Sequence, residues 1–166
     1  KQSVPITTST PSPNKQIELG QAQVYWLQSN QNKLTLVAKS LPSNTSGSTP
    51  QQVLTAVIIK LLTAQPSDNL TSTIPAGTKL RSLQVKPDGI HLDLSREFGT
   101  GGGSTSMIYR VAQTIYTATS LDPNQKVFLS VEGQSIDKEH PLGGEGLILR
   151  QPITRSQFDA DFPLNP

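Results

Sequence analysis

Residues 80–95 read LRSLQVKPDGIHLDLS, and this stretch determines the expected architecture. Pro87 presets φ for a tight turn and Gly89 accepts positive φ, so the residues on either side are expected to form a hairpin. The predicted strands are Leu80–Lys86 and Ile90–Leu94. Apolar and polar side chains alternate along the second strand, which indicates that one face of the sheet is covered and the other is open.

A helix is predicted on each side of this hairpin. The first has Thr49 as its N-cap, Pro50 at the first helical position and Gln52 three residues after the cap. This arrangement is a capping box with a proline start. The helix is expected to end before Pro66, and the second helix is expected to begin with Ser104 as its N-cap. Apolar residues recur at helical spacing in both, so each should face the core.

The remaining strands are predicted from runs of β-branched and aromatic residues. They are Gln23–Leu27, Leu34–Ala38 and Lys126–Glu132, with Leu147–Arg150 as an optional last strand. The expected order is therefore β-β-α-β-β-α-β. It predicts a two-layer α+β fold, in which two helices pack on one face of a mixed sheet of about five to six strands.

The chain of 166 residues has the length of one domain. Residues 1–16 are rich in Ser, Thr and Pro, and we expect them to form a flexible linker that tethers the domain to an N-terminal membrane anchor outside this sequence. The alternative is a disordered tail with no role. The folded domain is predicted to span residues 17–152. Residues 153–166 are expected to form a C-terminal tail, from which Phe158 and Phe162 can dock on the domain.

Charge and composition exclude several classes of function. The 14 basic and 12 acidic residues are scattered and give a net charge of +2, whereas nucleic-acid modules concentrate their cations on one face. We therefore expect no nucleic-acid partner. The absence of cysteine excludes a disulfide framework, a cysteine nucleophile and thiolate metal sites. No apolar run is long enough to span a bilayer. The many Ser, Thr, Gln and Asn residues are common in exported bacterial proteins.

His91, Asp93 and Ser95 share the open face of the second hairpin strand. They are candidates for a hydrolytic or metal site, but same-strand side chains at this spacing lie about 7 Å apart. A nucleophile and its base need about 3 Å. We therefore predict no catalytic residue, no metal and no cofactor. Together with Glu97 these residues form a candidate partner contact; alternatively, Asp93 and Ser95 bond the backbone of the neighbouring glycine loop.

The glycine loop, residues 99–103 (GTGGG), precedes the second predicted helix. Helix N-termini bind anions, but no Lys follows and the glycine spacing does not match a dinucleotide fingerprint. Gly101, Gly102 and Gly103 are instead expected to form a mobile connector that contacts a partner. Glycan stacking on Tyr25, Trp26 and Tyr116 is a further hypothesis, although core packing explains these aromatic residues as well.

Several of these segments occur in the order and spacing of a known family. They are Val24-Tyr25, Leu61-Leu62 followed by Ala64 and Pro66, IPAGT (74–78), GIHLDLS (89–95), VAQTI (111–115) and VFLSVEG (127–133). Together they resemble the GerMN domain of sporulation and spore germination proteins, from about Val24 to Arg150. The chain departs from the family pattern in having Gln65 where a Gly usually precedes the proline, and one copy of the domain in place of a tandem pair.

The resemblance implies a fold similar to the ring-building modules of envelope machinery, and an extracytoplasmic place in a lipoprotein or membrane-anchored protein. It brings no catalytic residues. The expected function is a non-enzymatic assembly or interaction module, whose partners are envelope proteins, further copies of itself or peptidoglycan. The alternative is a peptidoglycan- or glycan-binding protein or a cell-wall-acting enzyme that uses the face around His91, Asp93 and Glu97.

Overall fold

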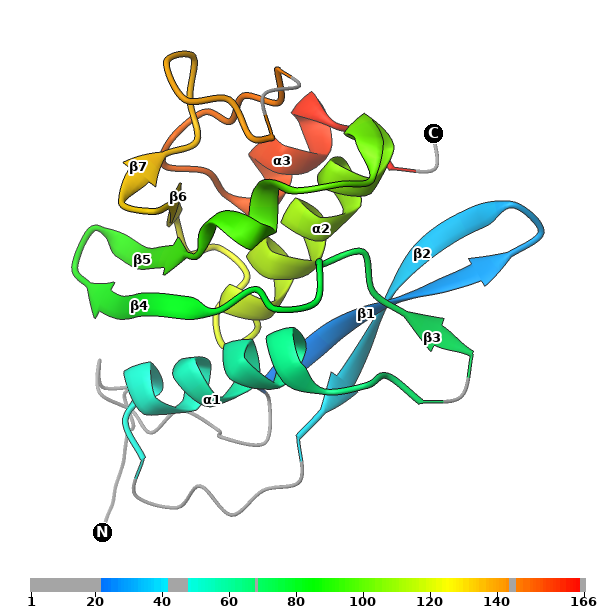
Figure 1. The fold of residues 1–166 in the computed structure, drawn as a ribbon. Coiled ribbons are helices and arrows are strands. Elements are labelled where there is room, and N and C mark those ends of the chain that lie inside the picture. The colour runs from blue at the N-terminus through cyan, green and yellow to red at the C-terminus, as the bar shows by residue number, and fades with distance from the viewer. Residues whose placement is uncertain (1–21, 42–47, 68, 144–145, 165–166) are drawn as a thin grey trace, which may run out of the picture.

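The computed structural model describes residues 22–41, 48–67, 69–143 and 146–164, so the expected linker at residues 1–16 lies outside it. The predicted α+β class is confirmed. The strands form two separate sheets, one of three strands and one of four, and α-helices lie between and beside them (Figure 1). In the described part of the chain, no helix has both the length and the apolar character needed to cross a membrane.

The first sheet is antiparallel, with strand order β2-β1-β3. It consists of β1 (Gln23–Asn30), β2 (Lys33–Ser40) and the short β3 (Leu70–Thr71). Gln31 and Asn32 connect β1 to β2 with positive φ at both positions, which is the turn that matches the twist of a two-residue hairpin. Strand β1 begins at Gln23 as predicted but continues further toward the turn, and β2 is longer than predicted at both ends.

Helix α1 (Pro50–Thr63) confirms the predicted capping box. The Thr49 hydroxyl accepts from the backbone N–H of Gln52, and the Gln52 side chain accepts from the N–H of Thr49. Val53, Val57 and Leu61, with their neighbours on the same stripe, are buried. The helix packs on both sheets, through β1 and the outer strand β4.

The second sheet has the order β4-β5-β6-β7. Its strands are β4 (Leu80–Lys86), β5 (Gly89–Leu94), β6 (Val127–Val131) and β7 (Gln134–Ser135). The pair β4–β5 is the predicted hairpin, and β5–β6 is parallel. A parallel pair needs a crossover, and the chain makes it through the short 3-10 helix η2 (Arg96–Gly99) and helix α2 (Gly103–Ala118).

The prediction of one continuous sheet with both helices on one face is wrong. Helix α2 runs through the middle of the molecule, between the β1–β2 hairpin and the second sheet (Figure 1). Side chains of α2 and of the turn that follows it bond the outward main chain of β1: Tyr25 N–H donates to Thr117 Oγ1, and Gln23 N–H donates to Ser120 Oγ, each at 3.0 Å. Because the helix occupies this edge, β1 cannot pair with a strand of the second sheet.

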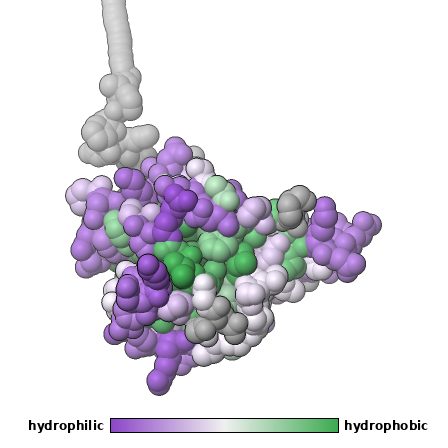
Figure 2. Space-filling view, turned by 90° about the horizontal axis from the view of Figure 1, so that it is seen from above, coloured by the Kyte–Doolittle hydropathy of each residue, from purple (hydrophilic) through white to green (hydrophobic). Residues whose placement is uncertain are grey.

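The structure also differs from the prediction at the start of α2 and in the C-terminal residues. Helix α2 begins at Gly103 with Gly102 as its N-cap, not with Ser104 as predicted. Residues 147–150 form no strand beyond an isolated bridge between Leu142 and Leu147. Residues 153–166, the expected tail, contain helix α3 (Arg155–Asp161). Its Phe158 is fully buried in the same core as the rest of the domain. On the face seen in Figure 2, apolar residues gather at the centre and hydrophilic residues lie toward the edges.

Candidate functional site

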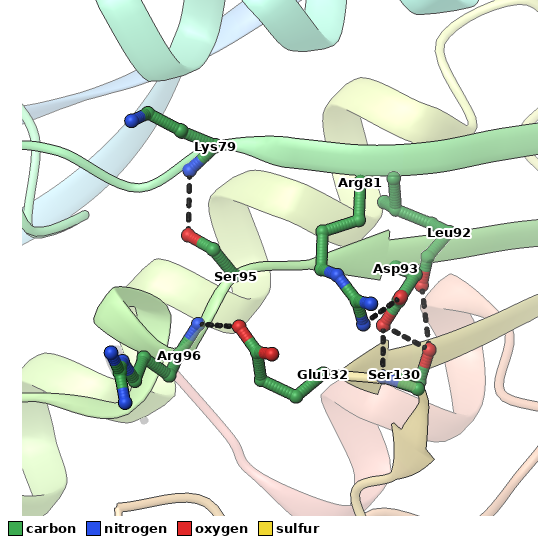
Figure 3. Close-up of polar contacts among 9 residues, drawn as sticks. Lys79, Arg81, Leu92, Asp93, Ser95, Arg96, Ser130 and Glu132 are labelled. Carbon is green, nitrogen blue, oxygen red and sulfur yellow. Dashed lines mark hydrogen bonds and ion pairs between the residues drawn. The ribbon is translucent and has the colours of Figure 1, made fainter.

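The solvent-facing side of β5 carries the residues that the sequence singled out. As predicted, the alternate residues Ile90, Leu92 and Leu94 are buried, whereas His91 and Asp93 lie on the open side. Figure 3 shows that the polar side chains here come from β4, β5, β6 and the turns that follow β5 and β6. Asp93, Ser95, Ser130 and Glu132 each have an intramolecular partner, and these partners decide what the surface can do.

The carboxylate of Asp93 ties together the strands on both sides of β5 (Figure 3). One oxygen binds Arg81 Nη1 on β4 at 2.8 Å. The other accepts from Ser130 Oγ on β6 at 2.8 Å and from the backbone N–H of Gly133 at 2.9 Å. Both oxygens are therefore engaged in holding the sheet, and the charge of Asp93 is neutralised by Arg81.

Ser95 fixes the segment that leads into β4. Its hydroxyl accepts from the N–H of Lys79 at 2.8 Å, and its own N–H donates to the carbonyl of Lys79 at 2.9 Å. A hydrogen bond from the Ser95 side chain also holds the pKa of Glu97 below its ordinary value. Nearby, the carboxylate of Glu132 accepts from the N–H of Arg96 at 2.9 Å. These contacts are local and structural.

His91 is partly exposed and lies near the hairpin turn. Its Nε2 lies 2.8 Å from the carboxylate of Asp88 in the hairpin turn, and the bond from His91 lowers the pKa of Asp88. Its ring stacks on Phe128 of β6, with ring centroids 4.2 Å apart and planes 10° apart. Phe128 is half-buried and sits directly opposite His91 in the parallel register. The two rings stand side by side on the solvent-facing side of the sheet, and each covers one face of the other.

The structure does not bring His91, Asp93 and Ser95 together, whereas Ser95 contacts Glu97. His91 bonds Asp88, Asp93 bonds Arg81 and Ser130, and Ser95 bonds Lys79. The alternative in which Asp93 and Ser95 bond the glycine loop is wrong, because the backbone partners of both lie elsewhere, at Gly133 and Lys79. Among the described residues, no group of three His, Asp or Glu side chains is arranged to hold a metal ion.

Sequence reasoning missed the residue that organises the glycine loop. Arg110 on α2 is 2% exposed, and its guanidinium donates to the carbonyls of Phe98, Thr100 and Gly101 at 2.8 to 3.0 Å. Burial lowers the pKa of Arg110. A cation within the apolar face of a predicted helix was the available signal, since a buried arginine needs several acceptors.

The three glycines expected to contact a partner have different surroundings. Gly101, Gly102 and Gly103 all have positive φ and are exposed. A Cβ on Gly102 would lie 2.5 Å from Ser106 Oγ and 2.7 Å from Arg110 Nη2, whereas Gly101 and Gly103 have no atom within 4 Å of that position. The glycine loop therefore packs against α2 at Gly102, whereas Gly101 and Gly103 face open space.

Comparisons with known proteins agree with this architecture. The family model "Germane: Sporulation and spore germination" matches residues 23–137, which is more than half of the chain. The chain belongs to this family. The match begins with β1 and extends past β7, so it covers both sheets of this Germane domain and both of its long helices. No curated protein sequence matches the chain at a significant level.

Solved structures resemble the Germane domain in fold. The first GerMN domain of the sporulation protein GerM from Bacillus subtilis has a TM-score of 0.58 and 22% identity, over 81% of this chain and 96% of that chain. A putative lipoprotein from Clostridium perfringens has a TM-score of 0.53 and 20% identity, over 81% and 86%. The tandem GerMN domains of GerM have a TM-score of 0.55 and 22% identity, over 80% of this chain and 46% of that one.

Proposed function

We propose that this Germane domain is a non-enzymatic extracytoplasmic assembly module of the cell envelope, and that its partners are envelope proteins or further copies of itself. Family membership supports the general role. Two of the similar folds come from a sporulation protein and one from a putative lipoprotein, which favours an envelope location for this chain as well. In the full-length protein the module would be held at the membrane through an N-terminal anchor.

The observation that carries this proposal is the state of the open face of the second sheet. Arg81 is paired with Asp93 and His91 with Asp88 within the domain. A partner on this face would meet the stacked rings of His91 and the half-buried Phe128, with the exposed Gln84 beside them on β4. Aromatic side chains with satisfied polar neighbours are typical of protein contacts. The polar residues themselves hold the strands of the sheet together.

Site-specific photo-crosslinking in living bacteria tests this proposal. A photoreactive amino acid at Gln84, in the full-length protein, should crosslink to envelope proteins or to a second copy of the chain. The same group at the exposed Lys138, in the loop after β7, is the matched control and should give weaker crosslinks. Crosslinks from position 84 to cytoplasmic proteins alone would contradict the envelope location. Equal patterns from both positions would contradict a role for this face.

Glycan binding is the second candidate function, and one observation favours it. Tyr25 and Tyr116 meet edge to face at 5.3 Å, and the Tyr116 hydroxyl bonds the carboxylate of Asp159. Tyr116 and Asp159 lie between two open clefts of about 420 and 470 Å³, and both clefts are lined by these two residues. Trp26, the third aromatic residue of the hypothesis, is 5% exposed and belongs to the core.

Co-sedimentation with insoluble peptidoglycan separates the two functions. If glycan binding is the function, the chain should pellet with the polymer, and Tyr25→Ala should reduce the pelleted fraction. The variant Phe128→Ala should leave it unchanged, because Phe128 lies on the second sheet, outside both clefts. Absence of pelleting at physiological salt would remove the glycan candidate and leave the assembly role.

A further inference from the structure

The outer edge of β4 faces helix α1 and has unused strand-pairing capacity. In the β4–β5 register, Lys86 lies opposite Gly89 across the two-residue turn, and Gln84 lies opposite His91. Such pairs exchange both backbone hydrogen bonds, so the intervening residues Leu83 and Val85 direct their N–H and C=O groups away from β5. No described strand pairs with this side of β4. An edge of this kind is a template for another chain.

At one position of this edge, a side chain provides the hydrogen-bond partner that a neighbouring strand would otherwise supply. The backbone N–H of Val85 donates to Gln51 Oε1, in the first turn of α1, at 2.9 Å. A carboxamide oxygen thus takes the place of a carbonyl on a neighbouring strand. In the described part of the chain, no side chain does the same for Leu83. At the Val85 end, the Gln51 side chain therefore fills the space between α1 and β4. At the Leu83 end, no described residue gives β4 a hydrogen-bonding partner on this side.

At that other end lies an apolar groove. It has a volume of about 480 Å³ and lies between the C-terminal half of α1 and residues 78–83. Ile59 and Leu62 line its helix side, and Leu83 lines its strand side. Ile59 is 45% exposed and is one of two large apolar side chains exposed to this degree in the described residues. A second cleft, of about 580 Å³, shares Leu62 and Lys79 and extends the groove past β3.

The charged residues in the lining of the groove are cations. Lys79 and Arg81 are the charged residues that line the groove and its extension. The guanidinium of Arg81 is bound to Asp93 on the open face of the sheet, so Lys79 is the cation left to the groove. Lys60, exposed in the last turn of α1, adds a second positive charge next to Ile59. A ligand for this surface should therefore carry negative charge beside apolar side chains.

We propose that the groove between α1 and β4 binds an extended peptide segment of a partner protein as an added strand. The segment pairs its backbone with the outward groups of Leu83, places an apolar side chain on Ile59 and Leu62, and directs an acidic side chain toward Lys79. This is strand addition beside a helix, in which main-chain bonds give affinity and alternate side chains give specificity. The inference rests on the proposed assembly role and deepens it by naming the chemistry of one partner, and it uses a surface separate from the His91–Phe128 pair.

Panning of a phage-displayed library of random linear peptides against the chain tests this proposal. The enriched peptides should share alternating apolar residues next to Asp or Glu. A synthetic copy of one such peptide should protect the amide of Leu83 from hydrogen exchange. The same peptide with N-methyl groups at alternate positions should bind at least about ten-fold more weakly, because methylation removes its strand donors.

Two variants localise the binding and one serves as control. Ile59→Asp and Lys79→Glu should each weaken the peptide by about ten-fold or more. Ile148→Asp changes the other exposed large apolar residue, which lies outside the groove, and should leave affinity unchanged. Equal binding to Ile59→Asp and to the unmodified chain, or no enrichment in panning, would overturn the inference. Crosslinking from Gln84 reports on the open face independently, so the two proposals can fail separately.

Discussion

Gln113 on α2 holds the main chain of Tyr25 on β1, with its Nε2 donating to the Tyr25 carbonyl at 3.1 Å. The same carboxamide accepts from the N–H of Thr73 at 3.0 Å and donates to Ser72 Oγ at 3.2 Å. Gln113 is fully buried. One side chain thereby joins the central helix to β1 and to the segment that follows β3.

Replacement of Gln113 by Leu should destabilise the domain strongly. The new side chain has a similar volume, but it leaves the Tyr25 carbonyl and the Thr73 N–H buried without a partner. We expect a loss of about 2 to 4 kcal/mol in the free energy of unfolding, measured by urea denaturation. Gln134→Leu, at an exposed position of β7, is the matched control and should change it by less than about 0.5 kcal/mol. Similar losses in both variants would contradict the role of Gln113.

Arg110 should be needed for the order of the glycine loop. Arg110→Met keeps the apolar length of the side chain but removes the donors that bind three loop carbonyls. We expect a loss of about 2 to 4 kcal/mol in unfolding free energy, with faster amide exchange around residues 99–103. Arg96→Met, in the neighbouring turn, alters an exposed arginine and should have little effect. Slow exchange in the loop of Arg110→Met would show that the loop is held by other contacts.

The two neighbouring glycines Gly101 and Gly102 should respond differently to alanine. Both substitutions impose the cost of a left-handed conformation on a residue with Cβ, about 1 kcal/mol. Only at Gly102 does the new Cβ also overlap Ser106 and Arg110. Gly102→Ala should therefore cost at least about 1 kcal/mol more than Gly101→Ala in thermal or urea unfolding. Equal costs would mean that α2 can shift its first turn to make room.

Tyr116 should make the domain sensitive to alkaline pH. Partial burial and the bond to Asp159 raise the pKa of Tyr116 to about 12, compared with about 10 in an unfolded chain. Between these values the unfolded state releases a proton that the folded state keeps. The stabilisation from Tyr116 is therefore complete below about pH 10 and is lost as the pH rises toward 12.

Unfolding measured across this pH range checks the expectation. The wild-type chain should lose stability more steeply with rising pH than Tyr116→Phe, which has no hydroxyl to ionise. An ultraviolet titration should show one late tyrosinate, absent from the variant. If both chains lose stability along the same slope, the Tyr116–Asp159 bond does not control the ionisation.

The sequence predicted the elements whose signals are local. The capping box of Thr49 and Gln52 and the Pro87-Asp88 turn depend on neighbouring residues, and both are confirmed. The same kind of box, Thr154 with Gln157, starts α3, so a signal for that helix was present within the expected tail. The start of α2 differs by two residues because Gly102, with φ of 90°, takes the N-cap position that was predicted for Ser104.

What escaped prediction depends on contacts between distant residues. Strand β3 has two residues and exists because Leu70 and Thr71 reach β1, which no periodicity can reveal. The division into two sheets depends on Gln113 and Thr117, which bond strand β1 from helix α2. Polar residues on a predicted helix are ordinarily assigned to solvent, and here they are directed inward. For the candidate site, the sequence placed His91 and Asp93 on the open face but could not identify their partners.

Three glutamine side chains in this structure form hydrogen bonds with the main chain of a strand. Gln51 bonds the main chain of β4, Gln113 that of β1, and Gln151 both the N–H and the carbonyl of Leu129 on β6. Each carboxamide has the donor and acceptor of a peptide group, so it can bond the main chain of a strand as a neighbouring strand would. These ties between distant segments are neutral dipoles, and mobile ions screen charges far more than they screen short dipolar bonds. The shape of the domain should accordingly be the same in dilute and in concentrated electrolyte.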